Sequence, residues 1–80
     1  MMELEVLKKA IEKILQVYST EITPEATFDT ALGADSIDMA QIFKLVEEEL
    51  GIRIPPAEWS KARTVGEAHA LILKVKAHEG

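Results

Sequence analysis

At 80 residues, the chain is long enough for one small domain, residues 1–80. Its core is expected to be aliphatic, because 48% of the residues are hydrophobic but only 5% are aromatic. The absence of cysteine excludes disulfides, thiolate metal sites and a cysteine nucleophile. The net charge of −5 disfavours nucleic acid as a partner, because its phosphates would repel the protein, and it favours partners with basic patches.

The sequence also bears on location and on metal binding. No basic segment followed by an apolar run opens the chain, and no apolar run approaches the ~20 residues of a membrane span. His69 and His78 lack a histidine or carboxylate partner at the spacing of metal ligands. We therefore expect a cytoplasmic monomer that contacts no membrane and holds no metal ion.

A first helix is predicted over residues 3–18. Its apolar residues recur at steps of three and four, and charged residues fill most of the opposite face. The apolar stripe consists of Leu4, Leu7, Ile11, Ile14, Leu15 and Tyr18. This stripe is expected to face the core.

Residues 19–35 form a long connection without a sustained helical stripe. A Thr-Pro pair and scattered Asp and Thr residues are typical of loops. Connections of this length are unusual in compact domains and are often functional. Ile22, Phe28 and Leu32 are expected to pin the loop to the core.

The rest of the chain is organised around the segment Leu32-Gly33-Ala34-Asp35-Ser36-Ile37-Asp38-Met39. Gly33 marks a turn, and Asp35 and Ser36 are both good N-cap residues for the amphipathic run that follows. That run predicts a second helix over residues 36–50, which Gly51 ends. Ser36 is therefore placed on the surface at a loop-to-helix junction, where another enzyme can reach its hydroxyl. The alternative is that Ser36 serves only as a helix cap.

The second helix is expected to have two different faces. Its buried face consists of Met39, Ile42, Phe43, Val46 and Leu50. Its outward face continues from Ser36 through Ile37, Ala40, Gln41, Lys44 and Glu48. Glu47, Glu48 and Glu49 stand at the C-terminal end, where the helix dipole disfavours negative charge by a few tenths of a kcal/mol, roughly. This run is either a solvated charged face or a docking surface for a basic partner.

Two further helices are predicted in the last part of the chain. Ile52 and Ile54 are expected to pack inward, and Pro56 opens a short helical piece over residues 57–62 with Trp59 partly buried. Thr64-Val65-Gly66-Glu67 has the pattern of a capping box, and the helix that follows extends to about Ala77. Its apolar stripe consists of Val65, Ala68, Leu71, Ile72 and Val75.

No residue is predicted to be catalytic. The sequence places no histidine near Ser36, so a serine-nucleophile enzyme is disfavoured. Asp35 and Asp38 flank Ser36, and carboxylates beside a serine do not make it a good nucleophile. They make it a good substrate for a metal-dependent transfer, in which Mg²⁺ bridges an acidic residue and a phosphate.

Taken together, these features resemble an acyl carrier protein of the discrete, type II-like kind. The resemblance rests on Leu32-Gly33-Ala34-Asp35-Ser36-Ile37-Asp38, on Leu45-Val46-Glu47-Glu48-Glu49-Leu50-Gly51-Ile52-Arg53-Ile54-Pro55, on Thr64-Val65-Gly66-Glu67-Ala68 and on Phe28. It covers essentially the whole chain.

This resemblance implies a fold and a function. The fold is an all-α four-helix bundle of acyl-carrier type, with three longer helices, one short helix and a long loop between the first two. A phosphopantetheinyl transferase would use coenzyme A to attach phosphopantetheine to Ser36. The thiol of this arm would carry acyl groups as thioesters for enzymes of a fatty-acid or a related acyl or polyketide pathway. A growing chain would slip into the bundle core.

The resemblance also implies roles for the residues around Ser36. The transferase would recognise Asp35 and Asp38. Acyl-transfer, condensing and other acyl-processing enzymes with basic patches would dock on a face made of Ile37, Ala40, Gln41, Lys44, Glu47 and Glu48.

Three positions depart from the commonest fatty-acid pattern. Ile37 stands where Leu is usual, while Gln41 and Lys44 stand where many fatty-acid carriers have an acid and an apolar residue. These departures favour a specialised route over bulk fatty-acid synthesis. Two alternatives stay open: a carrier of aminoacyl, peptidyl or polyketide intermediates, and a helical adaptor with no prosthetic group. Peptidyl carriers typically have a Gly-Gly-x-Ser motif and a less acidic second helix. The segment Gly33-Ala34-Asp35-Ser36 and the run Glu47–Glu49 argue against a peptidyl carrier but not against a polyketide one.

Overall fold

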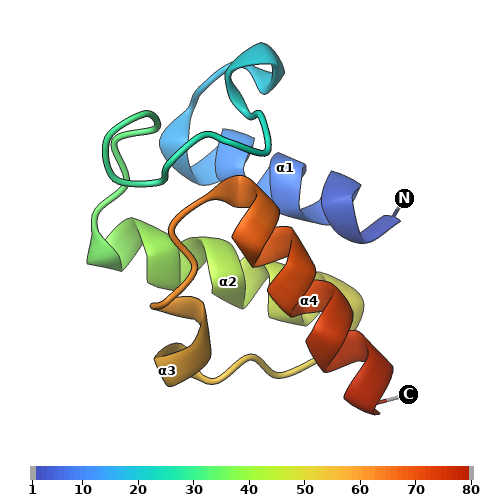
Figure 1. Ribbon diagram of the computed structural model, residues 1–80. Helices are drawn as coiled ribbons and strands as arrows, with labels where there is room; N and C mark the ends of the chain where they lie inside the picture. The colour runs from blue at the N-terminus through green and yellow to red at the C-terminus, as the bar shows by residue number, and fades with distance from the viewer. Residues whose placement is uncertain (1, 80) are drawn as a thin grey trace.

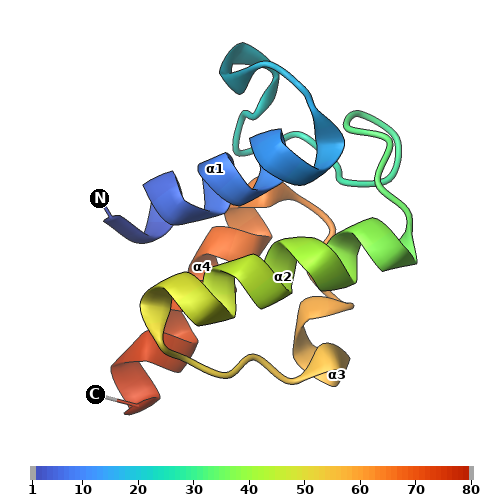
Figure 2. The same cartoon turned by 180° about the vertical axis from the view of Figure 1, so that it is seen from behind.

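The computed structural model describes residues 2–79 and is all-α, as predicted. Three longer helices, α1 (Met2–Leu15), α2 (Ser36–Leu50) and α4 (Val65–Glu79), pack around a common core (Figure 1). A short helix, α3 (Pro56–Trp59), lies in the connection from α2 to α4, and a single turn of 3₁₀ helix, η1 (Ser19–Glu21), opens the long loop between α1 and α2. Seen from behind, α2 runs below α1 and in front of α4 (Figure 2).

The core is aliphatic, with one aromatic pair at its edge. Most side chains predicted to face inward from α2 and α4 are buried, whereas in the predicted α1 stripe Leu7 and Ile11 are buried and Leu4, Ile14 and Leu15 are half-buried. No polar residue is classed as buried among the described residues. The largest fully buried side chains are Phe43, Leu7, Ile11, Ile42, Ile54, Ile72, Val46 and Val65. Phe43 stacks on the half-buried Trp59 with ring centroids 5.6 Å apart, which ties α3 to α2.

The end of α1 differs from the prediction. The helix ends at Leu15 rather than at residue 18, because Gln16 adopts a left-handed backbone conformation with φ of 57°. Tyr18 is consequently not part of the apolar stripe, and 79% of its surface is exposed. A non-glycine residue in this conformation leaves no clear sequence signal for a helix end.

The long loop is fastened to the core and to the start of α4. Ile22, Phe28 and Leu32 are all buried, which confirms the three predicted anchors. The loop backbone also bonds to the segment before and at the start of α4, through Phe28 N to Arg63 O at 3.0 Å, Val65 N to Ala26 O at 3.0 Å and Gly66 N to Pro24 O at 2.9 Å. These long-range bonds and an isolated antiparallel bridge between Thr27 and Thr64 fix the loop against the start of α4.

The connection from α2 to α4 follows the prediction except at the helix bounds. Ile52 and Ile54 are buried as expected, and Gly51 ends α2 with φ of 66°. Pro56 is itself the first residue of α3, which stops at Trp59 and does not reach residue 62.

The last helix begins with the predicted capping box. Glu67 N donates to Thr64 Oγ1 at 3.1 Å, while Glu67 Oε1 accepts from Arg63 N at 2.7 Å and Thr64 N at 3.4 Å. The helix then continues to Glu79, two residues past the predicted Ala77, and Lys76 Nζ pairs with Glu3 Oε2 of α1 at 3.3 Å.

Candidate functional site

The start of α2 is capped by its aspartates and not by its serine. Asp38 N donates to Asp35 Oδ1 at 2.8 Å, and Asp35 N donates to Asp38 Oδ2 at 3.2 Å. This reciprocal box satisfies two backbone donors that a helix start leaves without intrahelical partners. The box therefore takes over the capping role that Ser36 would otherwise have filled.

Ser36 is the first residue of α2, and it is exposed. Within residues 2–79 its hydroxyl makes no hydrogen bond, and the N–H groups of Ser36 and Ile37 have no acceptor. A free hydroxyl thus stands beside free amide donors at the positive end of a 15-residue helix. This is a favourable setting for an anionic group attached to the serine oxygen.

Exposure alone does not single out Ser36, because the other two serines of the chain, Ser19 and Ser60, are exposed as well. Ser60 Oγ donates to Ala57 O at 3.3 Å, and Ser19 begins the single turn η1. Of the three, Ser36 alone stands in the first turn of a long helix.

A cleft of about 270 Å³ opens directly beside Ser36, between the long loop, α2 and the segment from α3 to α4. One set of lining side chains is apolar: Phe28, Ala34, Met39, Trp59 and Ala62. The other set is polar: Asp29, Asp35, Ser36, Ser60 and Arg63. The cleft can therefore receive an extended, mostly apolar chain that begins at an anionic linkage on Ser36.

The predicted docking face lies on the outside of α2, with one exception. Ile37, Ala40, Gln41, Lys44 and Glu48 are exposed, and Ile37 shows 67% of its surface. Glu47 is half-buried, and its Oε2 accepts from Ile54 N at 2.6 Å. The side chain of Glu47 is thus used to hold the link after α2, a role that helical spacing did not reveal.

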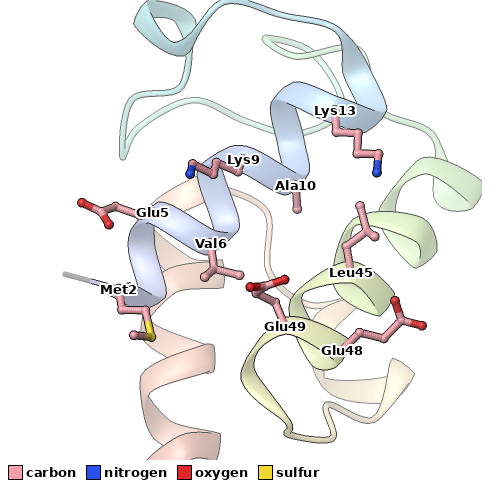
Figure 3. Close-up of a pocket in the computed structure, with 9 residues that line it drawn as sticks. All are labelled: Met2, Glu5, Val6, Lys9, Ala10, Lys13, Leu45, Glu48 and Glu49. Atoms are coloured by element: carbon pink, nitrogen blue, oxygen red, sulfur yellow. The ribbon is translucent and has the colours of Figure 1, made fainter.

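A second groove lies toward the other end of α2, where it packs against α1 (Figure 3). Lys9 and Lys13 stand on its α1 side, and Glu48 and Glu49 stand on its α2 side. At about 520 Å³ this groove is larger than the Ser36 cleft, but it contains no serine and is lined by residues of the two helices alone. This groove is therefore a feature of the α1–α2 surface that is separate from the cleft beside Ser36.

Sequence reasoning identified the helix start but not the far wall of the cleft. Asp29, Ser60 and Arg63 reach the rim of the cleft because the long loop bonds to the segment before α4. The short antiparallel bridge that joins the two segments involves Thr27 and Thr64, which show no strand pattern. No signal in the sequence would have placed Arg63 on the same cleft as Ser36.

No helix among the described residues combines the length and the apolar character that crossing a lipid bilayer requires.

Residues 5–72 match the family model described as "Phosphopantetheine attachment site". The match takes in most of α1, the long loop, α2, α3 and the first half of α4. Members of this family are non-catalytic carriers of phosphopantetheine, which are modified by phosphopantetheinyl transferases and interact with acyl-processing enzymes.

The residues at the start of α2 fit this group. Phosphopantetheine joins its protein through a phosphodiester, which needs an accessible hydroxyl, and it supplies a thiol on which acyl groups are held as thioesters. Ser36 has such a hydroxyl, amides of α2 without an acceptor among residues 2–79 belong to the same helix start, and the adjacent cleft is lined in part by apolar residues. The fold, the exposed helix start and the matched residues agree, and the chain belongs to the phosphopantetheine attachment-site family of carrier proteins.

Proposed function

We propose that residues 1–80 form a single acyl carrier domain that bears phosphopantetheine on Ser36. The arm delivers acyl thioesters to enzymes of a fatty-acid or a related acyl or polyketide pathway. The observation that supports Ser36 is its position: it is the first residue of α2, exposed, with a hydroxyl that no group within residues 2–79 engages. Asp35 caps the helix in its place.

The attachment reaction needs only the oxygen of Ser36 from this chain. An Oγ–P bond forms at the pantetheine-side phosphorus of coenzyme A, a P–O bond of the pyrophosphate breaks, and adenosine 3′,5′-bisphosphate leaves. The hydroxyl proton goes to a base of the transferase. The helix dipole of α2 then stabilises the negative charge of the phosphodiester by about 0.3–1 kcal/mol.

Asp35 and Asp38 are the proposed recognition residues for the transferase. The capping box uses Oδ1 of Asp35 and Oδ2 of Asp38. The second oxygen of each carboxylate forms no bond within residues 2–79, so it remains for a Mg²⁺ ion or a basic side chain of the transferase. The box therefore fixes the direction of both carboxylates on either side of Ser36.

The cleft beside Ser36 supports an acyl cargo. Its apolar wall includes Met39, whose flexible side chain adapts to a chain of varying length. Each methylene buried there gains roughly 0.8 kcal/mol, less the cost of loosening the packing. The acidic α2, with Glu47–Glu49 at its end, favours acyl or polyketide cargo over peptidyl cargo, while Gln41 and Lys44 favour a specialised route.

Partners are proposed to dock along the outside of α2. The exposed Ile37 supplies an apolar contact next to Ser36, and Glu48 supplies negative charge farther along the helix. Net charge of −5 speeds the encounter with a basic patch on an enzyme and does not by itself produce tight binding, which suits a monomeric carrier with several partners.

Intact-protein mass spectrometry tests this proposal. The apo protein, Ser36→Ala and Ser60→Ala are each incubated with coenzyme A and a broad-specificity transferase, and circular dichroism confirms that all three are folded. We expect the native protein and Ser60→Ala to gain the mass of one phosphopantetheine and Ser36→Ala to gain none. Ser60 is the matched control because it is an exposed serine on the rim of the same cleft.

The other outcomes are equally informative. Modified Ser36→Ala would contradict the assignment of the site. A folded native protein that gains no mass, and that carried no arm when purified, would favour the helical adaptor instead. Once the arm is attached, loading with a panel of acyl, aminoacyl and polyketide-type donors identifies the cargo.

A further inference from the structure

Arg63 is a cation that lines the Ser36 cleft and has no anionic partner among residues 2–79. It lies in the short segment between α3 and α4, it is exposed, and it lines both the cleft beside Ser36 and a neighbouring hollow between α3 and α4. Within residues 2–79 its guanidinium forms no ion pair and no hydrogen bond, although Asp29 and Asp35 line that cleft as well. An arginine with five donors is thus left free next to the proposed attachment site.

The backbone of Arg63 is held on both sides. Its carbonyl oxygen accepts from Phe28 N at 3.0 Å, and its own N–H donates to Glu67 Oε1 at 2.7 Å. The next residue, Thr64, bridges to Thr27 of the long loop. Because the loop also leads directly into α2, these bonds set the position of Arg63 relative to the start of that helix.

The charge around Ser36 is otherwise negative. Asp29 and Asp35 line the cleft, and Asp38 lies in the first turn of α2. A phosphodiester on Ser36 adds another negative charge to this group. The amides at the start of α2 offset part of the repulsion, and Arg63 is the one cation among the described residues that lines the cleft.

We propose that Arg63 binds the phosphodiester of the arm once it is attached, and so directs the arm along the cleft. The inference rests on the proposed attachment at Ser36. A guanidinium can donate two parallel hydrogen bonds to the two non-bridging oxygens of a phosphodiester, which fixes direction as well as charge. Arg63 acts here as a positioning residue for the arm.

Lys61 provides the matched control. It is an exposed cation two residues away that lines the neighbouring hollow together with Arg63 but does not line the Ser36 cleft. Replacing Lys61 by glutamine removes the same unit of charge from the same segment. An effect of net charge alone would therefore appear equally in Lys61→Gln and Arg63→Gln.

The test compares the native protein, Arg63→Gln, Arg63→Lys and Lys61→Gln in apo and modified forms, with modification verified by mass. ³¹P NMR spectra of the modified proteins are recorded for the folded state and for the state unfolded in urea. We expect Arg63→Gln to move the native phosphodiester resonance toward its denatured position, and Arg63→Lys to do so in part. Lys61→Gln should leave the resonance unchanged.

The melting temperature gives a second readout. We expect the difference in melting temperature between the modified and apo forms to be about 1–4 °C smaller in Arg63→Gln than in the native protein. This difference should also depend less on salt in Arg63→Gln. Equal resonances and equal melting differences in Arg63→Gln and Lys61→Gln would overturn the role of Arg63 while leaving attachment at Ser36 intact. No mass gain at Ser36 in the native protein would overturn both.

Discussion

The starts of α2 and α4 share one capping device but present opposite surfaces. Asp35 with Asp38, and Thr64 with Glu67, each form a reciprocal box between side chains and backbone amides. The first residue inside the box is Ser36 in α2, which is exposed, and Val65 in α4, which is 1% exposed. The same type of cap is thus followed by an exposed hydroxyl in α2 and by a buried core side chain in α4.

The difference comes from what lies against each helix start. The long loop covers α4: Val65 N bonds to Ala26 O, and the position of a Cβ on Gly66 would be only 3.1 Å from Pro24 O. The same loop leads into α2 and leaves a cleft there instead of a contact. A cap therefore specifies where a helix begins, whereas the packing of the loop decides whether its first residue is available for chemistry.

The largest expected difference is in the free energy of unfolding when the first residue of α2 or of α4 is replaced by alanine. Val65→Ala removes buried methyl groups from the core and should lower the free energy of unfolding by about 2–3 kcal/mol. Ser36→Ala removes an exposed, unbonded hydroxyl and should change it by less than about 0.5 kcal/mol. Urea unfolding followed by circular dichroism measures both. Equal losses would mean that Ser36 has a structural role.

Removing the caps should then separate stability from modification. Asp35→Ala and Thr64→Ala each leave amides without their side-chain acceptor, and each should cost about 1 kcal/mol of stability. Only Asp35→Ala should also slow the transferase, because Asp35 adjoins Ser36. The rate of mass gain at a temperature where both variants are folded decides the point. A similar slowing in Thr64→Ala would show that the transferase responds to stability alone.

The smallest expected change in stability comes from Glu3, which lies in α1 away from the starts of α2 and α4. It serves as a control for the other variants. A hydrogen bond from the backbone amide of Glu3 itself, together with Lys76, holds the pKa of the Glu3 carboxyl below its ordinary value. A carboxyl with a lowered folded pKa stabilises the fold above its unfolded pKa, and this contribution is lost as the pH falls through the folded pKa. Glu3→Gln should therefore be slightly less stable than the native protein at pH 7.

The pH dependence checks that control. The stability difference between Glu3→Gln and the native protein should shrink as the solution is acidified below the folded pKa of Glu3, and modification should be unaffected throughout. Unfolding curves across this range, paired with mass spectrometry at neutral pH, provide the measurement. A difference that stays constant with pH would mean that the Glu3–Lys76 pair does not act through charge.

Local signals predicted the elements well, because their causes lie within a few residues. Gly51 ends α2 and the Thr64–Glu67 pattern begins α4, since left-handed glycines and capping boxes are short-range devices. The end of α1 was missed because Gln16 takes the conformation that glycine usually takes.

The candidate site was predictable in part for the same reason. The spacing within residues 32–39 was enough to place Ser36 at an exposed helix start. Asp35 and Ser36 are both common N-cap residues, so the sequence alone does not decide which of them precedes the first helical residue. The position of Arg63 on the Ser36 cleft and the bond from Ile54 N to Glu47 depend on contacts between distant segments, for which the sequence has no periodic signal.

Attachment at Ser36 is tested by locating the attached group on the native protein by tandem mass spectrometry after treatment with coenzyme A and a transferase. The chain has three serines, and we predict phosphopantetheine on the fragment that contains Ser36, with Ser19 and Ser60 unmodified. Phosphopantetheine on either of the other two fragments, or its absence from a folded apo protein, would contradict it.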